Sequence, residues 1–248
     1  MKTKSRKGLT LLELLMVLVI LAAVAGIVIP IAANVITRAH GSTGATNIAE
    51  IAKAIQQHPV LHNEPANLFD SLIDDAGTIV EDVDGNPLGG TGLALEDLSD
   101  ASANDARIID ALNDIGITES MEHEANSTNK TFAPYSGNTI PIDNTGSVVV
   151  LTVDGVASLG LNPLGTNVVA YVAVGLGAES TLIGRSILNA PVHFPEQGES
   201  VADVYSRFLL IYAIPANGPA RLAAVAAAHE DGLSNLNTHL LEYYATQE

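Results

Sequence analysis

The sequence contains no cysteine, so no disulfide can stabilise the fold, and the chain suits either a reducing or an oxidising compartment. Basic residues are also scarce, because 11 Lys and Arg stand against 28 Asp and Glu. Four of those eleven lie in residues 1–7, which leaves seven basic and 28 acidic residues after Gly8, a net charge of −21. This charge argues against direct binding of nucleic acid and against unaided binding to an anionic lipid surface.

Motifs typical of hydrolytic enzymes are missing as well. Neither His-Glu-x-x-His nor Gly-x-Ser-x-Gly occurs, and neither an internal repeat nor a flexible linker divides the chain. With 248 residues the chain can form one or two domains and bury a core outside a membrane. A single apolar run has the length needed to cross a bilayer.

That apolar run lies near the N-terminus. From Leu14 to Ile29 there is no polar side chain, and the next charged residue is Arg38. As a helix over residues 9–33, the run is about 37 Å long, against a hydrocarbon core of roughly 30 Å. The basic residues in front of it are expected to stay in the cytoplasm, so everything after the span is predicted to be exported.

One carboxylate, Glu13, lies close to the start of the apolar run. An ionised acid in a spanning helix costs on the order of 3 kcal/mol and usually has a partner. A secretory signal peptide instead has an apolar centre of about 7–15 residues and a cleavage site after it. We therefore expect a retained helix in which Glu13 is paired, with an ordinary signal anchor and a chance glutamate as the alternative.

The stretch Gly8-Leu9-Thr10-Leu11-Leu12-Glu13 resembles the cleavage and methylation signature of type IV pilins and type II secretion pseudopilins. The resemblance implies that a prepilin peptidase removes residues 1–8 as a leader by cutting after Gly8, and then methylates the amine of Leu9. Glu13 takes the place of the family's fifth-position glutamate. Pro30 is the twenty-second residue counted from Leu9, where many members of the family have a proline.

The same resemblance implies the partners and the location of the protein. Family filaments pack these helices in parallel and staggered, so that Glu13 of one subunit meets the Leu9 amine of an identical or homologous neighbour. The resemblance further implies a single-pass protein of the inner membrane, in contact with lipid and an assembly platform, with its N-terminus cytoplasmic, its head in the periplasm and a later place in a filament. This predicts a structural subunit and not an enzyme. The rival hypothesis is an exported enzyme or ligand-binding module on a signal anchor.

After the span the helix is expected to continue as an amphipathic half over residues 34–58. Apolar residues recur at helical spacing on one side: Ile48, Ile51, Ala52 and Ile55. Two glycines in the segment 41–44, and Pro30, predict a kink or local melting at each place. Pro59 predicts that the helix ends near His58, after about 74 Å.

Residues 59–248 are predicted to form an exported α+β head, whose antiparallel sheet buries the apolar face of the long helix, as in the pilin fold. The patterns predict helices over 64–75, from a Ser102 cap to Gly116, over 219–228 and over 233–244. They predict a hairpin with strands 148–153 and 156–161 joined at Asp154-Gly155, strands over 168–174 and 205–214, a turn cluster over 82–90, and a loop over 118–146.

The turn cluster Asp82-x-Asp84-Gly85-Asn86-Pro87-Leu88 is similar to a segment of major pseudopilins that can hold Ca²⁺. Hard oxygen ligands on a glycine turn suit calcium, so Asp82 and Asp84 are candidate ligands, and a solvated turn is the alternative. Asp84 and Leu88 replace the tryptophan and tyrosine of that segment. The partial match and the missing cysteines favour a secretion pseudopilin over a surface pilin, in many of which a disulfide closes the C-terminal loop.

Two further patterns favour structural roles. His58 and His62 are four residues apart and could form a metal pair, but Pro59 is expected to break the helix that would put them on one face, so a surface position is predicted for both. His193 is expected to fill a loop. The segment from Gly175 to Ser180 partly imitates a dinucleotide-binding loop. Its third glycine is replaced by Ser180 and its flanks are not βαβ, so a turn at the end of a strand explains the glycines.

Overall fold

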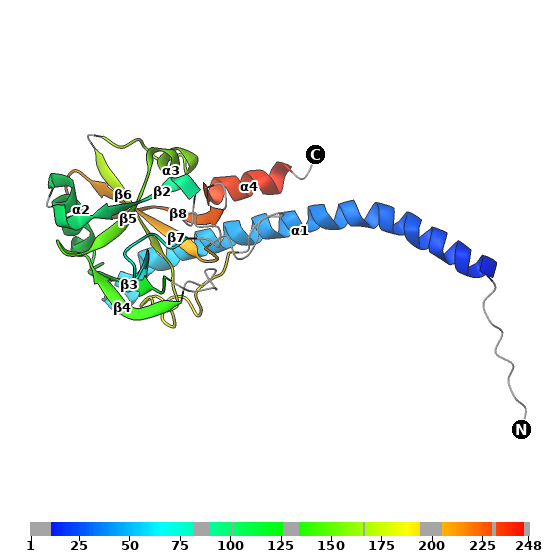
Figure 1. The fold of residues 1–248 in the computed structure, drawn as a ribbon, viewed down its shortest axis with the longest axis horizontal. Coiled ribbons are helices and arrows are strands. Elements are labelled where there is room, and N and C mark those ends of the chain that lie inside the picture. The colour runs from blue at the N-terminus through cyan, green and yellow to red at the C-terminus, as the bar shows by residue number, and fades with distance from the viewer. Residues whose placement is uncertain are drawn as a thin grey trace, which may run out of the picture.

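Helix α1 (Leu11–His62) sets the outline of the molecule. The structure, a computed structural model, describes residues 11–81, 90–100, 102–125, 134–165, 167–193, 205–229 and 232–245. At 1.5 Å per residue the 52 residues of α1 extend about 78 Å. Figure 1 shows the N-terminal half of α1 projecting from a head that the rest of the chain forms, while its C-terminal half lies against that head.

The head combines one mixed sheet with three shorter helices. The helices are α2 (Ala103–Asp114), α3 (Val153–Ser158) and α4 (Leu236–Ala245), with 3₁₀ turns at Gly90–Gly92 and Leu98–Asp100. The strands are β1 (Phe69–Asp74), β2 (Leu93–Asp97), β3 (Glu119–His123), β4 (Tyr135–Pro141), β5 (Ser147–Leu151), β6 (Val168–Gly175), β7 (Phe208–Pro215), β8 (Arg221–His229) and β9 (Gly232–Asn235).

Strand β6 is the branch point of the sheet. It pairs with β7 along its whole length, while its other edge is shared by β5, opposite Ala173, and β1, opposite Gly175. The order of the main path is β4-β3-β1-β6-β7-β8-β9, and β2 joins through β5. The pairing of β1 with β3 is parallel, and the other described strand pairs are antiparallel.

Both faces of the sheet are buried, and β7 shows this most clearly. Phe208 and Leu210 belong to a core that lies between the sheet, α1 and α2. Leu209 and Ile211 belong to a second core on the opposite face, which includes Val156 of α3. A continuous apolar run is what a strand covered on both faces requires. The predicted α+β class, with a long N-terminal helix packed on an antiparallel sheet, is confirmed.

The predictions with a strong local signal are confirmed. Ile48, Ile51 and Ile55 are buried against the sheet. Ser102 caps α2 by accepting a hydrogen bond from the Asp105 backbone N–H at 3.1 Å, and the Asp105 carboxylate accepts one from the Ser102 N–H at 2.8 Å. This reciprocal arrangement satisfies two backbone donors at the start of the helix.

Helix α1 runs further and more regularly than the sequence predicts. The helix continues without a break through Pro30, which itself donates no backbone hydrogen bond, and through the segment 41–44, so the predicted local melting is not found; the kink at Pro30 stays a prediction. The predicted end near His58 is wrong, because the helix continues through Pro59 to His62. It ends where Asn63 adopts a left-handed conformation with φ of 52°.

The predicted helix over residues 64–75 is wrong, because Phe69–Asp74 is strand β1. Leu72 has φ of 62°, and the register of β1 against β3 shifts after Asp70. This irregularity puts Phe69 into one core and both Leu72 and Ile73 into the other. A strand interrupted in this way loses its two-residue alternation, and its apolar spacing imitates a helix.

The predicted hairpin over residues 148–161 is half wrong. Its first strand is β5, but the Asp154-Gly155 pair lies in the first turn of α3, where the Thr152 hydroxyl accepts from the Gly155 N–H at 3.2 Å. Gly155 also packs tightly against the backbone, since a Cβ there would lie 2.2 Å from the Gly92 carbonyl oxygen. The glycine is required for this close approach and not for a tight turn.

The alanine-rich stretch 219–228 is also wrongly predicted as a helix. It forms strand β8, between β7 and β9, where Ala226 and Ala228 face one core and Ala227 faces the other. The predicted helix over 233–244 divides into β9 and α4. Alanine has a high intrinsic preference for helix, but pairing on both edges of a strand overrides it.

The predicted loop over 118–146 contains strands β3 and β4 at the edge of the sheet. Their residues are polar and half-exposed, so no apolar alternation marks them in the sequence. The predicted strands over 168–174 and 205–214 are confirmed as β6 and β7. Most of the turn cluster, residues 82–89, lies outside the described residues.

Candidate functional site: the anchor helix and its seat on the head

The projecting part of α1 is apolar on every side. From Leu11 to Ile29 no side chain is buried by the rest of the chain, and among the described residues this is the one helix long and apolar enough to cross a membrane. Fourteen large apolar side chains are exposed on it. Complete burial of each would contribute about 1.5–3 kcal/mol, so this segment requires a cover of lipid or of other helices. We refer to Leu11–Ile29 as the anchor.

Glu13 is the single charged side chain of the anchor and is exposed in its first described turn. The free N–H groups of a helix start favour a negative charge at this position. Gly8 and Leu9, the predicted cleavage and methylation residues, lie outside the described residues. The predicted contact between Glu13 and a neighbouring Leu9 amine therefore stays a prediction.

The second half of α1 has a defined seat on the head. Ala45, Ile48, Ile51 and Ile55 are each at most 9% exposed, and the three isoleucines belong to the core shared with the sheet, whereas the same helix is exposed from Leu11 to Ile29. We refer to Ala45–His58 as the seat. The helix changes its surroundings completely within sixteen residues, so the anchor and the head are joined through one continuous element.

Helix α4 packs along α1 and covers part of the seat. The contact is close at Gly44, where a Cβ would lie 3.4 Å from the His239 ring. In the sequence this glycine predicts only a weakened helix, and its contact with His239 is not apparent there. Two segments from opposite ends of the chain meet here, and no local pattern in the sequence indicates such a pairing.

A group of three buried histidines supports this junction. The rings of His193, His229 and His239 have centroids 4.9–6.0 Å apart, and His193 is buried as predicted for a loop-filling residue. The Ser234 hydroxyl lies 2.6 Å from His229 Nε2 and 3.2 Å from His239 Nε2. The point on which these two ring nitrogens converge is therefore filled by the Ser234 hydroxyl, and the three histidines do not form a metal site among the described residues.

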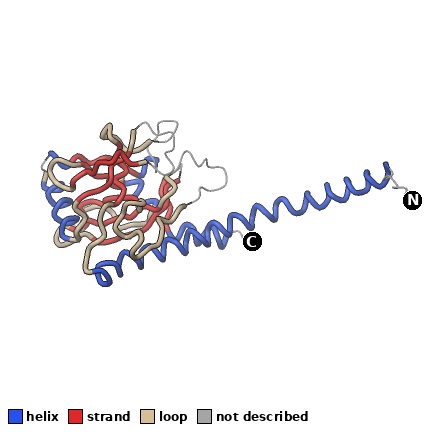
Figure 2. Tube along the Cα trace, turned by 90° about the horizontal axis from the view of Figure 1, so that it is seen from below, coloured by secondary structure: helices blue, strands red, loops and turns tan. Residues whose placement is uncertain are grey.

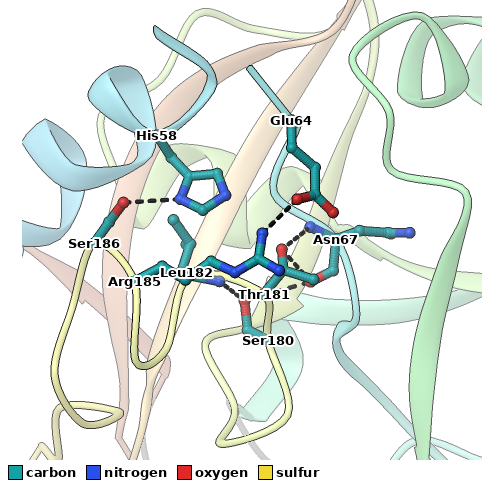
Figure 3. A network of polar contacts seen from close by, with 8 residues as sticks. All are labelled: His58, Glu64, Asn67, Ser180, Thr181, Leu182, Arg185 and Ser186. Carbon is teal, nitrogen blue, oxygen red and sulfur yellow. Dashed lines mark hydrogen bonds and ion pairs between the residues drawn. The ribbon is translucent and has the colours of Figure 1, made fainter. Parts of the chain in front are cut away.

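The end of α1 is fixed by the loop that follows residue 180, as Figure 3 shows. His58 is buried and its Nδ1 lies 2.8 Å from the Ser186 hydroxyl. Burial lowers the pKa of His58, and the neighbouring His62 and Arg185 act in the same direction, so the ring is held neutral. The predicted surface position of His58 is therefore wrong. The His58 and His62 rings share one helix face with centroids 4.8 Å apart.

The chain just after α1 is held by the same loop. The Asn67 N–H donates to the Thr181 hydroxyl at 2.9 Å, and the Thr181 N–H donates to the Asn67 carbonyl at 3.1 Å. Glu64 and Arg185 form an ion pair at the surface, with side chains about half exposed. This network of polar contacts (Figure 3) fixes the direction in which the chain leaves the seat and enters β1.

A buried carboxylate lies deeper in the head. Asp70 accepts a hydrogen bond from the Tyr135 hydroxyl at 2.6 Å and another from the Tyr205 hydroxyl. Burial raises the pKa of Asp70, while His123 and the two phenol donors act in the opposite direction. The cluster joins β1 and β4 to the start of β7, and sequence analysis missed it because each member comes from a distant segment.

The glycines that imitate a dinucleotide loop pack onto this cluster. A Cβ at Gly177 would lie 1.6 Å from Asp70 Oδ1, and a Cβ at Gly175 would lie 2.0 Å from the Tyr205 hydroxyl. The space beside both glycines is therefore filled by side chains of the head. They end strand β6, as the alternative interpretation predicted.

The described residues form a groove but no cluster of metal ligands. Asp82 and Asp84, the candidate calcium ligands, lie outside the described residues, and within the described part no group of three His, Asp or Glu side chains could hold a metal ion. A groove of about 470 Å³ runs between the seat and the segment 185–191. Its charged residues are Glu50, Lys53 and Arg185.

Taken together, an apolar anchor, a seat continuous with it and a mostly antiparallel sheet define an α+β, pilin-like architecture. Comparison with protein families adds one match: residues 3–29 match the family described as "Prokaryotic N-terminal methylation motif". The chain thus carries the N-terminal signature of type IV pilins and pseudopilins. The match includes the predicted cleavage residue Gly8, Glu13 and the apolar run, and it does not extend to the head. Neither a curated protein nor a solved structure matches the chain.

Proposed function

We propose that this protein is a structural, non-enzymatic subunit of a type IV pilus-like filament, and specifically a type II secretion pseudopilin. The observation that carries the proposal is the anchor, an apolar helix exposed on every side that bears the methylation motif and continues without a break into the head. A helix of this kind can be covered by lipid before assembly and by the anchors of other subunits afterwards.

The proposed sequence of events begins in the inner membrane. The basic residues of the leader stay in the cytoplasm, and the acidic head is exported to the periplasm. Prepilin peptidase cleaves after Gly8 and methylates Leu9, and an inner-membrane assembly platform then moves the subunit into the filament. Other subunits of the same or a homologous kind are the main partners, and the charge of −21 argues against direct binding of DNA.

Glu13 is proposed to select the register of assembly. An anion within an apolar layer is stabilised when a cation reaches it, and removal of either member leaves the other charge without compensation. The amine of Leu9 on a neighbouring subunit is the proposed cation. Parallel anchors staggered along the filament axis would bring the two groups together, so each new subunit would be added at one height.

The choice of a secretion pseudopilin over a surface pilin rests on two sequence features. The segment from Asp82 to Leu88 resembles a calcium-binding turn of major pseudopilins, and the chain has no cysteine for a C-terminal disulfide loop. We propose Asp82 and Asp84 as ligands of a Ca²⁺ ion on that basis. The ion would neutralise part of the negative charge of this acidic turn.

The proposal is tested by Glu13→Ala in a host with a working processing peptidase and assembly machinery. We expect the variant to insert into the membrane and to be cleaved, but to be lost from the sheared filament fraction. Asp110→Ala, which removes an exposed carboxylate from α2 in the head, is the matched control and should assemble normally. Intact-mass analysis should show a wild-type chain that begins at Leu9 with one added methyl group.

The same experiment distinguishes the filament proposal from the rival function, an exported enzyme or ligand-binding module on a signal anchor. The groove of about 470 Å³ is where such a module would bind a ligand. On that hypothesis Glu13→Ala behaves like wild type, and residues 1–8 remain on the chain. Normal assembly of the variant would therefore falsify the proposed role of Glu13.

A further inference from the structure

Helix α4 lies beside α1 and points back towards the anchor. Figures 1 and 2 both show its C-terminal end directed to the projecting half of α1, so that the two helices are antiparallel. The packing of His239 on Gly44 fixes their relative height. Since both helices rise about 1.5 Å per residue, Tyr244 lies at the level of Ala39.

With the anchor in a bilayer, this level lies just outside the polar surface of the membrane. Ala39 is ten residues beyond Ile29 and six beyond the predicted end of the span at residue 33, which places Tyr244 about 9–15 Å above the hydrocarbon. The polar headgroup layer is roughly 5–8 Å thick on each side of the core. The extended side chain of Tyr244 can therefore reach that layer from α4.

The end of α4 exposes the side chains that such a surface favours. Leu241 is 69% exposed and Tyr244 is 59% exposed, and Val35 of α1, between their level and the anchor, is 57% exposed. These residues continue the exposed apolar surface of the anchor towards the head. Tyrosine is enriched at membrane interfaces because its ring is apolar and its hydroxyl can contact water.

We infer that the C-terminal turns of α4 dock on the headgroup layer of the leaflet that faces the head, while the subunit is stored in the bilayer. The inference rests on the membrane anchoring in the proposed function and adds a second point of contact. The lipid is zwitterionic in this proposal, since the chain carries −21 after Gly8 and would be repelled by an anionic surface. The anchor and the end of α4 together fix the tilt of the head relative to the membrane. Extraction into the filament must then break the contact between α4 and the headgroups.

The test uses the absence of tryptophan from the sequence, which makes one introduced tryptophan a unique fluorescent reporter. The full chain with Tyr244→Trp is reconstituted in phosphatidylcholine vesicles that carry a nitroxide quencher either on the headgroup or in the acyl chains. Val24→Trp reports on the anchor. Val60→Trp is the control, because Val60 is 83% exposed and lies 21 residues beyond Ala39 on α1, about 32 Å farther from the membrane.

We expect the acyl-chain nitroxide to quench Val24→Trp, the headgroup nitroxide to quench Tyr244→Trp, and neither to quench Val60→Trp. Quenching of Val24→Trp without headgroup quenching of Tyr244→Trp would overturn this inference and leave the anchor intact. A blue shift at position 244 without headgroup quenching would indicate contact with a second copy of the chain, and would also overturn it. If Val24→Trp itself is not quenched, the membrane anchoring is wrong and the inference fails with it.

Discussion

The anchor and the seat belong to one helix but have opposite surroundings, and their sequences differ in both the content and the spacing of apolar residues. In the seat, apolar residues recur at spacings of three and four residues, and the buried face of the helix contacts the sheet through Ile48 and Ile51. In the anchor every position except Glu13 and Gly26 is apolar, and no side chain is buried by the rest of the chain. Periodicity in the sequence thus indicates a partner within the same chain, and its loss indicates a partner outside it.

The largest effect on this comparison is expected from Ile51→Ala. Ile51 is 2% exposed in the core between α1 and the sheet, and deletion of such a side chain costs about 2–5 kcal/mol of folding free energy. The midpoint of thermal unfolding of the head should fall, while membrane insertion stays unchanged. Val17→Ala in the anchor is the matched control, and a drop in head stability for that variant would contradict the division into two halves.

A smaller effect is expected at Gly44. A Cβ there makes ordinary contact with His239 at 3.4 Å, and alanine is favoured over glycine in a helix by about 1 kcal/mol, so Gly44→Ala should stabilise the head by up to that amount. Gly44→Leu should instead displace α4 and destabilise the head. Denaturant unfolding of both variants is the measurement. Equal effects of the two substitutions would show that the fit against His239 is not what limits this position.

The smallest effect is expected from Arg185→Ala at the end of the seat. The ion pair with Glu64 is about half exposed, and such pairs contribute about 0–1 kcal/mol. The loss should shrink further in high salt, as seen by unfolding at two salt concentrations. A loss as large as that of Ile51→Ala would mean that charge pairing, and not apolar burial, holds the helix on the head.

The sequence predicts the parts of the fold whose cause is local. The spacing of Ile48, Ile51 and Ile55 and the cap formed by Ser102 need only neighbouring residues to be recognised, and both are confirmed. Strand β8 could not be predicted, because its alanines favour helix until β7 and β9 pair with them. The prediction for strand β1 was wrong for a different reason, because the left-handed conformation of Leu72 alters the spacing of its apolar residues.

The candidate site shows the same division. The motif around Gly8 and Glu13 is contiguous, and the family comparison confirms that it is present. The Gly44–His239 contact and the Asp70 cluster each join segments far apart in the sequence, so no spacing of residues along the chain predicts them. Sequence analysis therefore finds what the chain presents to other molecules near its N-terminus more readily than how the head is held together.

The packing of α4 on α1 also has a consequence for biogenesis. The seat is complete only when residues from the C-terminal end reach Gly44, near the N-terminal end. Contacts between such distant segments form late and slowly. If the head is exported as proposed, N-terminal residues first, it stays incomplete until nearly its whole length has crossed. Its final folding would then take place on the far side of the membrane.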